Sequence, residues 1–383
     1  MLKRIMTEPS HFLQWITLSK ANLKHNIGII RSHCSSRVEI AGILKANAYG
    51  HGLLPMAQLF RQCGLGIFMV HTLDEALTLH ESGSKERIIL LGPVAPAQIP
   101  LCLKKGFELT VYTQEILSAI KKAQKILSHP AKIHVKIETG TNRQGLDLKN
   151  IPDFISLLKS IQYELRGLSS HFANIEDTAD TSYYKKQIQC LKHAVRLFKK
   201  GGVQPDSLHI ACSAAVLLYP ETHFQLIRPG ISLYGYYSSP EVAYALKPTN
   251  PLRPVLSWKT RLVQIKNVGK GDFIGYGLTY KAMRKSKIGI LPIGYYDGYD
   301  RKLSNQGYVL VRGKRAGICG RICMNICMVD LTDIPEAKTQ DVVTLLGKDG
   351  KESITADHLA AMTNTISYEI LARLNPLIPR IVE

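Results

Sequence analysis

The sequence predicts an α/β protein in which a closed (β/α)8 TIM-type barrel is followed by an all-β domain. Three observations support this fold class. Apolar strands and helical stretches alternate over residues 38–227, short strands punctuated by glycine follow from about residue 248, and the chain of 383 residues can hold a barrel of about 250 residues and a second domain. We expect the barrel to span residues 1–247 and the β domain to span residues 248–383.

The barrel elements are predicted from hydrophobic periodicity and from glycine and proline at their ends. Strands are expected at residues 38–44, 66–70, 87–91, 109–112, 132–138, 165–169, 207–210 and 225–227. Helices are expected at residues 21–32, 53–63, 73–83, 95–105, 115–127, 152–160 and 182–200. This is the strand count of a closed parallel barrel, and an open doubly wound sheet is the alternative.

The second domain begins where three prolines, Pro248, Pro251 and Pro254, mark an extended segment. Short strands are expected at residues 255–268, 273–276, 287–292, 308–311, 316–319, 328–331 and 342–346, and a helical stretch at residues 354–374. Residues 12–18 near the amino terminus are a candidate for the first strand of this β domain.

The composition is that of an ordinary globular protein, with 45% hydrophobic and 21% charged residues. No apolar stretch approaches 20 residues, so we expect a cytoplasmic protein without a membrane span. The net charge of +19 could attract phosphorylated or carboxylated ligands or nucleic acid, but the basic residues are scattered and no nucleic-acid module accompanies them. The eight cysteines are expected to be reduced thiols.

Lys45 follows the apolar strand 38–44 directly and therefore lies at the carboxyl end of a barrel strand. Ligands bind at that end in α/β folds, and a partly desolvated lysine there can act as an amine nucleophile. A surface lysine at a strand end is the competing interpretation of the spacing alone.

The stretch Lys45-Ala-Asn-Ala-Tyr49-Gly-His-Gly resembles the cofactor-lysine motif of the alanine racemases, a family of pyridoxal phosphate enzymes. The resemblance extends over both predicted domains, from about Trp15 to Arg380. It implies that Lys45 binds pyridoxal 5'-phosphate covalently and that Tyr49 contacts the phosphate.

Further segments at the predicted strand ends match the family's cofactor site. Gly230 and Ile231 can offer backbone N–H groups to a phosphate after the last barrel strand. The resemblance implies that Arg228 donates to the pyridine nitrogen, that Ser213 binds phosphate and that His209 supports the arginine. Cys212 occupies a position where the family usually has asparagine.

The segment from Lys136 to Gly145 resembles a family motif at the end of another strand. By this resemblance Arg143 orients the cofactor and binds the substrate carboxylate, and Lys136 corresponds to a lysine that is often carbamylated. His171 matches a histidine that lies against the cofactor ring. Without these matches, a histidine at a strand end is more often a structural residue.

The β domain carries the segments that match the substrate side of the family's site. Tyr276 corresponds to the proton-transfer base on the opposite face of the substrate. Substrate-side contacts are expected from Tyr295 and Met324, with Cys323 and Asn325 in supporting positions. Asn325 stands where the family usually has aspartate.

One more tyrosine of this domain, Tyr368, matches a residue that contacts the cofactor phosphate. In the family, the β domain of one subunit completes the site of the other. A homodimer with shared active sites follows from the resemblance.

The resulting hypothesis is an isomerase that interconverts L-alanine and D-alanine with Lys45 and Tyr276 as the two bases, supplying D-alanine for peptidoglycan. Alternatives are a racemase of the same fold for serine, lysine or another amino acid, a non-catalytic pyridoxal phosphate carrier, and a basic nucleic-acid-binding protein. Cys319, Cys323 and Cys327 recur every fourth residue, but this spacing fits no common zinc or iron–sulfur motif, so no metal site is expected.

Overall fold

The computed structural model describes residues 9–383, which form two compact units. The first, here called the barrel unit, comprises Lys24–Ala46 and Met56–Arg253. The second, here called the β unit, comprises the described residues up to Leu23, the segment Asn47–Pro55 and the segment Pro254–Glu383. The segment that follows Lys45 therefore packs with residues that are distant in the sequence.

The barrel unit contains a parallel sheet in which consecutive strands are neighbours, in the order β3 to β9. Its strands are β3 (Gly42–Ile43), β4 (Ile67–Val70), β5 (Arg87–Leu90), β6 (Glu108–Val111), β7 (Ala131–Lys136), β8 (Tyr163–Ser169) and β9 (Leu208–His209). Runs such as Ile67 to Val70 are buried along their whole length, as expected for strands covered on both faces.

The sheet closes on itself through two further short strands, β2 (Glu39–Ile40) and β10 (Leu226–Ile227), which pair in parallel. The backbone N–H of Ala41 donates to the oxygen of Ile227 (3.0 Å), and that of Arg228 donates to the oxygen of Ala211 (2.9 Å). These bonds join the first strand to the last, so the predicted closed barrel is confirmed and the open doubly wound sheet is excluded.

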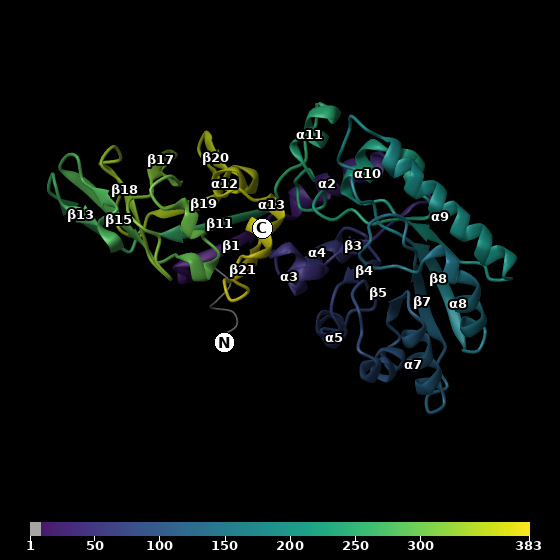
Figure 1. Cartoon of the computed structure of the whole chain (residues 1–383). Helices are drawn as coiled ribbons and strands as arrows, with labels where there is room; N and C mark the ends of the chain where they lie inside the picture. Colours follow the sequence, from purple (N-terminus) through teal and green to yellow (C-terminus); the bar gives the residue numbers. More distant parts are fainter. Residues whose placement is uncertain (1–8) are drawn as a thin grey trace. The chain divides into compact units, whose positions relative to one another are not determined.

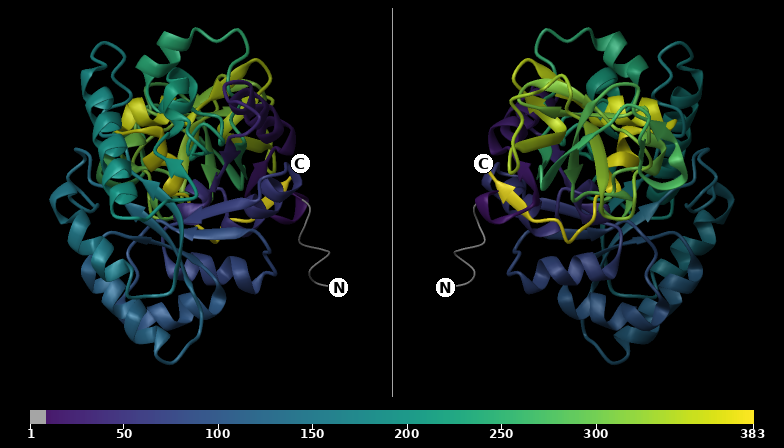
Figure 2. Two further views of the ribbon diagram at one scale, coloured as in Figure 1. Left: turned by 90° about the vertical axis from the view of Figure 1, so that its right-hand side faces the viewer. Right: turned by 90° about the vertical axis from the view of Figure 1, so that its left-hand side faces the viewer.

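Helices connect the strands and cover the outside of the sheet, as Figure 1 shows for α5, α7, α8 and α9. The helices are α2 (Lys20–Ser32), α4 (Leu53–Gln62), α5 (Leu73–Glu81), α6 (Ile99–Lys105), α7 (Gln114–Gln124), α8 (Ile151–Leu158), α9 (Ser182–Lys200), α10 (Ser213–Leu218) and α11 (Pro240–Leu246). The long teal helix α9 lies along the edge of the barrel unit in both views of Figure 2.

The β unit is built on one large sheet with strand order β17-β16-β19-β11-β1-β21. These strands are β1 (Gln14–Leu18), β11 (Leu256–Arg261), β16 (Tyr308–Val311), β17 (Lys314–Gly317), β19 (Val342–Asp349) and β21 (Arg380–Val382), and β20 (Glu352–Ile354) pairs with β19. The candidate strand at residues 12–18 contains β1, which pairs antiparallel with β11, with Ile16 opposite Trp258.

Two smaller sheets and two helices complete the β unit. β12 (Gln264–Val268), β15 (Ser286–Leu291) and β18 (Cys327–Asp330) form a three-stranded sheet, and β13 (Phe273–Ile274) pairs with β14 (Tyr280–Lys281). The helices are α12 (Ala356–Thr363) and α13 (Ser367–Ala372).

Several predicted elements are interrupted in the structure. The strand expected at 38–44 is two short strands, because β2 pairs with β10 and β3 pairs with β4. The helical stretch at 354–374 is two helices, since Asn364, the residue after α12, has a left-handed φ of 56°. The strand at 273–276 stops after Ile274, because Gly275 has a φ of 77°. The strand expected at 255–268 is β11 followed by β12.

Candidate active site

Lys45 begins a short left-handed helical turn, α3 (Lys45–Tyr49), immediately after the barrel strand β3. The φ angles of Ala46, Asn47, Ala48 and Tyr49 are 56°, 53°, 55° and 52°. An L-residue in this conformation costs roughly 1–2 kcal/mol, so four in succession must be held by their surroundings. Asn47 caps the next helix, because its Oδ1 accepts from the backbone N–H of Leu53 (2.8 Å).

Residues near the carboxyl terminus hold this turn within the β unit. Arg380 donates from Nη2 to the backbone oxygen of Gly50 (2.8 Å). Gly50 has a φ of 77°, and a Cβ at this position would lie 1.9 Å from the backbone oxygen of Leu371. The rings of Tyr49 and Tyr368 lie 6.0 Å apart. The structure therefore brings together the two tyrosines for which the family resemblance implies a contact with the cofactor phosphate.

The surroundings of the Lys45 amine lower its pKa and so raise the fraction of neutral amine. Burial lowers its pKa most, the charges of Arg143 and Arg228 lower it further, and Glu75 opposes them. A neutral amine is the nucleophilic form of lysine. Lys45 is thus a partly desolvated lysine at a strand end, as the sequence predicts. Glu75, which also affects its pKa, was not identified from the sequence.

A group of hydrogen-bond donors surrounds the hydroxyl of Ser213, the first residue of α10. The backbone N–H groups of Gly230 and Ser232 donate to Ser213 Oγ at 2.9 and 3.2 Å, and Ser232 Oγ lies 3.1 Å from the same oxygen. Ile231, between them, is fully buried. Backbone N–H groups and hydroxyls converging on one point are suited to an anion such as phosphate. Ser232 was missed by the sequence analysis.

Arg228 follows β10 and carries a guanidinium that is only partly satisfied. Its Nη2 donates to the backbone oxygens of Ser170 and Ile210. Its Nε is buried and has no partner among residues 9–383. Burial lowers the pKa of Arg228 to about 10, so the group remains charged at neutral pH. A buried N–H donor without a partner fits a ligand acceptor such as a pyridine nitrogen.

Lys136 is the last residue of β7, and its Nζ donates to Gln144 Oε1 at 3.3 Å. Gln144 in turn donates to the hydroxyl of Tyr112 (3.1 Å). Burial, followed by the charges of Arg228 and Arg143, lowers the pKa of Lys136 to about 8. Gln144 and Tyr112 are neighbours that only the three-dimensional structure identifies.

Arg143 lies exposed on the loop after β7, and Glu138 shapes this loop. The backbone N–H of Gly140 donates to Glu138 Oε1 (2.6 Å), and that of Arg143 donates to Glu138 Oε2 (3.3 Å). The loop thereby presents the guanidinium on the side of the barrel that carries Lys45, whose pKa it affects.

His171 lies just beyond β8 and is fixed through its backbone. Its oxygen accepts from Thr141 Oγ1 (2.7 Å) and from Gln187 Nε2 (3.0 Å). Gln187 is a fully buried residue of α9. Its position as a polar residue on the apolar face of that helix is the feature of the sequence that could have identified it. Burial, then the charge of Arg228, holds the pKa of His171 well below its usual range.

In the β unit, Tyr276 and Tyr295 lie in short 3-10 turns with side chains 74% and 43% exposed. The backbone N–H of Tyr295 donates to the oxygen of Cys323 (3.0 Å), which places Tyr295 beside the segment of Met324 and Asn325. Met324 is exposed, and Asn325 lies next to it on the surface. The structure thus groups Tyr295 with the predicted substrate-side segment Cys323, Met324 and Asn325, while Tyr276 lies on a separate turn.

Within residues 9–383, no three His, Cys, Asp or Glu side chains are placed to hold a metal ion, and all eight cysteines are free thiols. No helix in this range is long and apolar enough to cross a bilayer.

Comparison with known proteins places both units in one family. Residues 18–238 match the family model for the alanine racemase N-terminal domain, and residues 255–382 match that for the C-terminal domain. An alanine racemase from Leptospira interrogans is 39% identical over 378 residues, which cover 97% of this chain and 96% of the relative.

Solved structures agree with this match. The alanine racemase from Bacillus anthracis with bound L-Ala-P superposes with a TM-score of 0.92 at 34% identity, covering 98% of this chain and 96% of that one. A histidine racemase from Leuconostoc mesenteroides superposes with a TM-score of 0.88 at 29% identity, covering 98% of this chain and 100% of that one.

Proposed function

The chain belongs to the alanine racemase family, and we propose that it interconverts L-alanine and D-alanine with pyridoxal 5'-phosphate as cofactor. The observation that supports this most directly is the environment of Lys45. A lysine amine with a lowered pKa follows a barrel strand, and two arginines that the family uses for cofactor and substrate contribute to that shift.

The residues of the barrel unit fit the proposed cofactor. Lys45 would bind it covalently, Arg228 Nε would donate to its ring nitrogen, and Ser213, Gly230 and Ile231 would hold its phosphate. When bound, the cofactor delocalises the electron pair left at the substrate α-carbon. From the resemblance we also assign His171 to the ring, and Tyr49 and Tyr368 to the phosphate.

The chain's own residues would move the protons. Once the substrate amine has displaced Lys45 from the cofactor, the freed Lys45 Nζ would accept a proton from one face of the α-carbon, and Tyr276 Oη would exchange a proton on the other. Because Arg228 stays charged, its N–H would leave the ring nitrogen of a bound cofactor unprotonated and weaken the ring as an electron sink. Return of a proton to the α-carbon is then favoured over transamination.

We propose that Tyr276 acts in the site of a second copy of the chain. Large apolar side chains near it are exposed in this single chain, including Leu278 at 62% and Met283 at 76%. Exposed apolar side chains of this size are common at protein interfaces. They support a homodimer with shared sites, in which the β domain, residues 248–383, completes the site on the partner's barrel, residues 1–247.

Arg143 is proposed to bind the substrate carboxylate, with Tyr295 and Met324 on the substrate side. Cys323 and Asn325 support that side, and His209 supports Arg228.

We further propose that Lys136 is carbamylated, because an amine with a pKa of about 8 is partly neutral at physiological pH and can add CO2. We place the enzyme in the cytoplasm, where D-alanine would supply peptidoglycan synthesis.

A racemase for another amino acid is the second candidate. A histidine racemase shares the fold at a TM-score of 0.88, and Asn325 alters the charge on the substrate side relative to the usual aspartate. Turnover measured across alanine, serine, lysine and histidine distinguishes these possibilities.

The test of the proposed function starts with the absorbance spectrum of the purified protein before and after borohydride. We expect a cofactor band that borohydride fixes to the peptide containing Lys45, and conversion of L-alanine to D-alanine. Lys45→Arg should lose both, whereas Lys200→Arg at the exposed end of α9 should retain both. A protein that is labelled at Lys45 but racemises no amino acid would instead be a non-catalytic carrier.

A further inference from the structure

Three polar side chains on the barrel strands form a row that is almost completely buried. Glu108, His134 and His209 are 2%, 0% and 1% exposed, and they come from β6, β7 and β9. Glu108 is the first residue of its strand and His209 the last, so the row leads from the amino ends of the strands toward their carboxyl ends, where Arg228 lies. Buried polar groups destabilise a core unless they are hydrogen-bonded.

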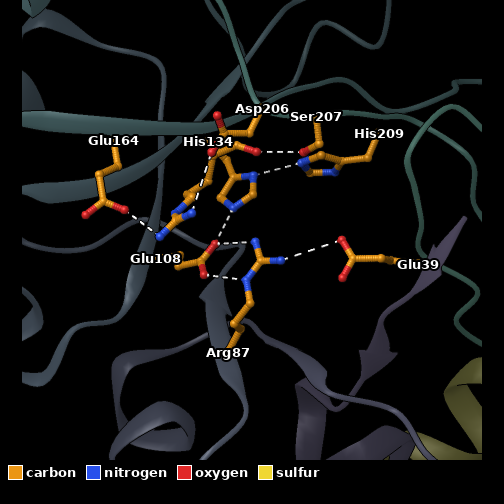
Figure 3. Close-up of polar contacts among 9 residues, drawn as sticks. Glu39, Arg87, Glu108, His134, Glu164, Asp206, Ser207 and His209 are labelled. Atoms are coloured by element: carbon orange, nitrogen blue, oxygen red, sulfur yellow. Dashed lines mark hydrogen bonds and ion pairs between the residues drawn. The ribbon is translucent and has the colours of Figure 1, made fainter. Parts of the chain in front are cut away.

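The contacts in this row are short and continuous (Figure 3). Arg87 donates from Nε to Glu108 Oε1 (2.8 Å) and from Nη2 to Oε2 (3.0 Å). Nε2 of His134 lies 2.8 Å from Glu108 Oε2, and Nδ1 of His134 lies 2.9 Å from Nε2 of His209. Each histidine is therefore hydrogen-bonded through its ring nitrogens, and the order of donors and acceptors along the row depends on the protonation states.

The protonation states follow from Glu108. Burial raises the pKa of Glu108, but hydrogen bonds from His134 and Arg87 outweigh this and lower the pKa to about 2, so the carboxylate is ionised and can only accept. Nε2 of His134 must then carry a proton. Burial lowers the pKa of His134, and Arg87 already neutralises Glu108, so a second positive charge on His134 is disfavoured.

A neutral His134 with its proton on Nε2 has a lone pair on Nδ1. That lone pair accepts from His209, so the proton of His209 is on Nε2 and its Nδ1 is unprotonated. Nδ1 of His209 is buried and has no partner among the described residues. Burial, then the charge of Arg228, lowers the pKa of His209. An unprotonated nitrogen suits this cationic environment, whereas an N–H at Nδ1 would be a buried donor without a partner.

We propose that Glu108 and His134 are positioning residues that fix His209 in the tautomer protonated on Nε2, so that its buried Nδ1 is left unprotonated and His209 adds no positive charge near Arg228. Arg228 itself is held by the backbone oxygens of Ser170 and Ile210. The hydrogen-bonded row from Glu108 through His134 to His209, called the relay below, thus favours the charged form of the arginine that we assign to the cofactor ring nitrogen. This inference rests on the proposed function for its catalytic consequence, but its structural content does not.

The test is nitrogen NMR of the full-length protein labelled with 15N-histidine. Long-range proton–nitrogen correlations report which ring nitrogen carries the proton, and loss of signals in His134→Gln and His209→Asn assigns the two residues. We expect both to be neutral and protonated on Nε2. A proton on Nδ1 of His209, or on both nitrogens of either ring, overturns the proposal.

Glu108→Gln perturbs the start of the relay. The amide of glutamine has only one acceptor oxygen, so in either orientation its NH2 group meets one N–H of Arg87. In the orientation that turns the NH2 group toward His134, His134 Nε2 must become an acceptor, which reverses the His134 tautomer. We expect a second set of His209 signals with the proton on Nδ1. The matched control is Glu86→Gln, a carboxylate of the same unit that accepts from Arg61 (3.0 Å) and Ser84 (2.6 Å) but from no histidine; it should leave the His209 signals unchanged.

Enzyme assays separate this inference from the proposed function. If wild-type protein racemises alanine, Glu108→Gln should lower kcat and raise the proportion of keto acid formed by transamination, with KM unchanged. Equal kcat and keto acid proportion in Glu108→Gln and wild type, despite an altered tautomer, would refute the positioning role. If wild-type protein racemises nothing, the proposed function fails, while the tautomers of the wild-type protein still decide whether the relay exists. Should Glu108→Gln not fold, the wild-type spectra alone decide it.

Discussion

Replacing Gly50 by alanine should destabilise the β unit far more than a glycine-to-alanine change normally does. Gly50 ends the left-handed turn that begins at Lys45, and its φ is 77°. An L-residue with this φ costs roughly 1–2 kcal/mol. The added Cβ would also lie 1.9 Å from the backbone oxygen of Leu371, so the backbone must move, and overpacking of this kind typically costs about 1–3 kcal/mol. We expect a total loss of about 2–5 kcal/mol of unfolding free energy.

Gly313→Ala is the control for the backbone conformation alone. Gly313 also lies in the β unit, has a φ of 74°, and an added Cβ would find its nearest atom, the oxygen of Asp349, at 3.8 Å. We therefore expect this variant to lose only about 1–2 kcal/mol. The difference between the two variants isolates the contact with Leu371.

The measurement is urea unfolding followed by tryptophan fluorescence. Both tryptophans of the chain, Trp15 and Trp258, belong to the β unit, so the signal reports on the unit that contains Gly50. The cofactor content of the purified variant gives a second readout, because a displaced Gly50 also displaces the turn. Equal losses for Gly50→Ala and Gly313→Ala would refute the claim that close backbone packing holds the turn.

Three further predictions concern ionisable groups. The pKa of Lys136 is lowered from 10.5 to about 8, so its reaction with 13CO2 should increase as the pH rises through 8. The adduct is trapped and detected by mass spectrometry, and it should be absent from Lys136→Arg. An increase only near pH 10.5 would contradict the argument that burial lowers this pKa. Tyr276→Phe should abolish racemisation but retain the cofactor. The control Tyr244→Phe, at a similarly exposed site in the barrel unit, should retain activity. Normal turnover in Tyr276→Phe would exclude this tyrosine as a base. Glu108 has a lower pKa in the folded than in the unfolded protein, so its stabilisation is present above about pH 4.5 and is lost as the pH falls toward 2. Acid unfolding of Glu108→Gln should therefore depend less steeply on pH in this window, and an unchanged slope would contradict the assignment.

The sequence was informative where structure depends on local pattern. The predicted helix at 182–200 coincides with α9, because a long amphipathic period leaves little choice of boundaries. The predicted strand 308–311 coincides with β16, because Gly307 and Gly313 bound this short apolar run. The predicted strand boundaries were wrong where pairing with a distant strand determines them. At residues 38–44, one apolar run is divided into two strands because each part pairs with a different strand.

The same distinction applies to the candidate site. The lysine, arginines and tyrosines were identified from motifs, since each follows a recognisable run of residues. Ser232, Gln144 and Gln187 were missed because their roles depend on contacts made across the fold. The left-handed turn was also unpredictable, because no local propensity favours four consecutive non-glycine residues with positive φ.

The segment Asn47–Pro55 lies in the barrel half of the sequence but packs with the carboxyl-terminal unit. Arg380 binds Gly50 within that unit, and the ring of Tyr368 lies near that of Tyr49. A barrel produced alone, or grafted onto another β domain, would carry Lys45 without the partners that hold the turn beyond it. Minimal or chimeric versions of this enzyme should therefore exchange residues 47–55 together with the carboxyl-terminal segment, as one module.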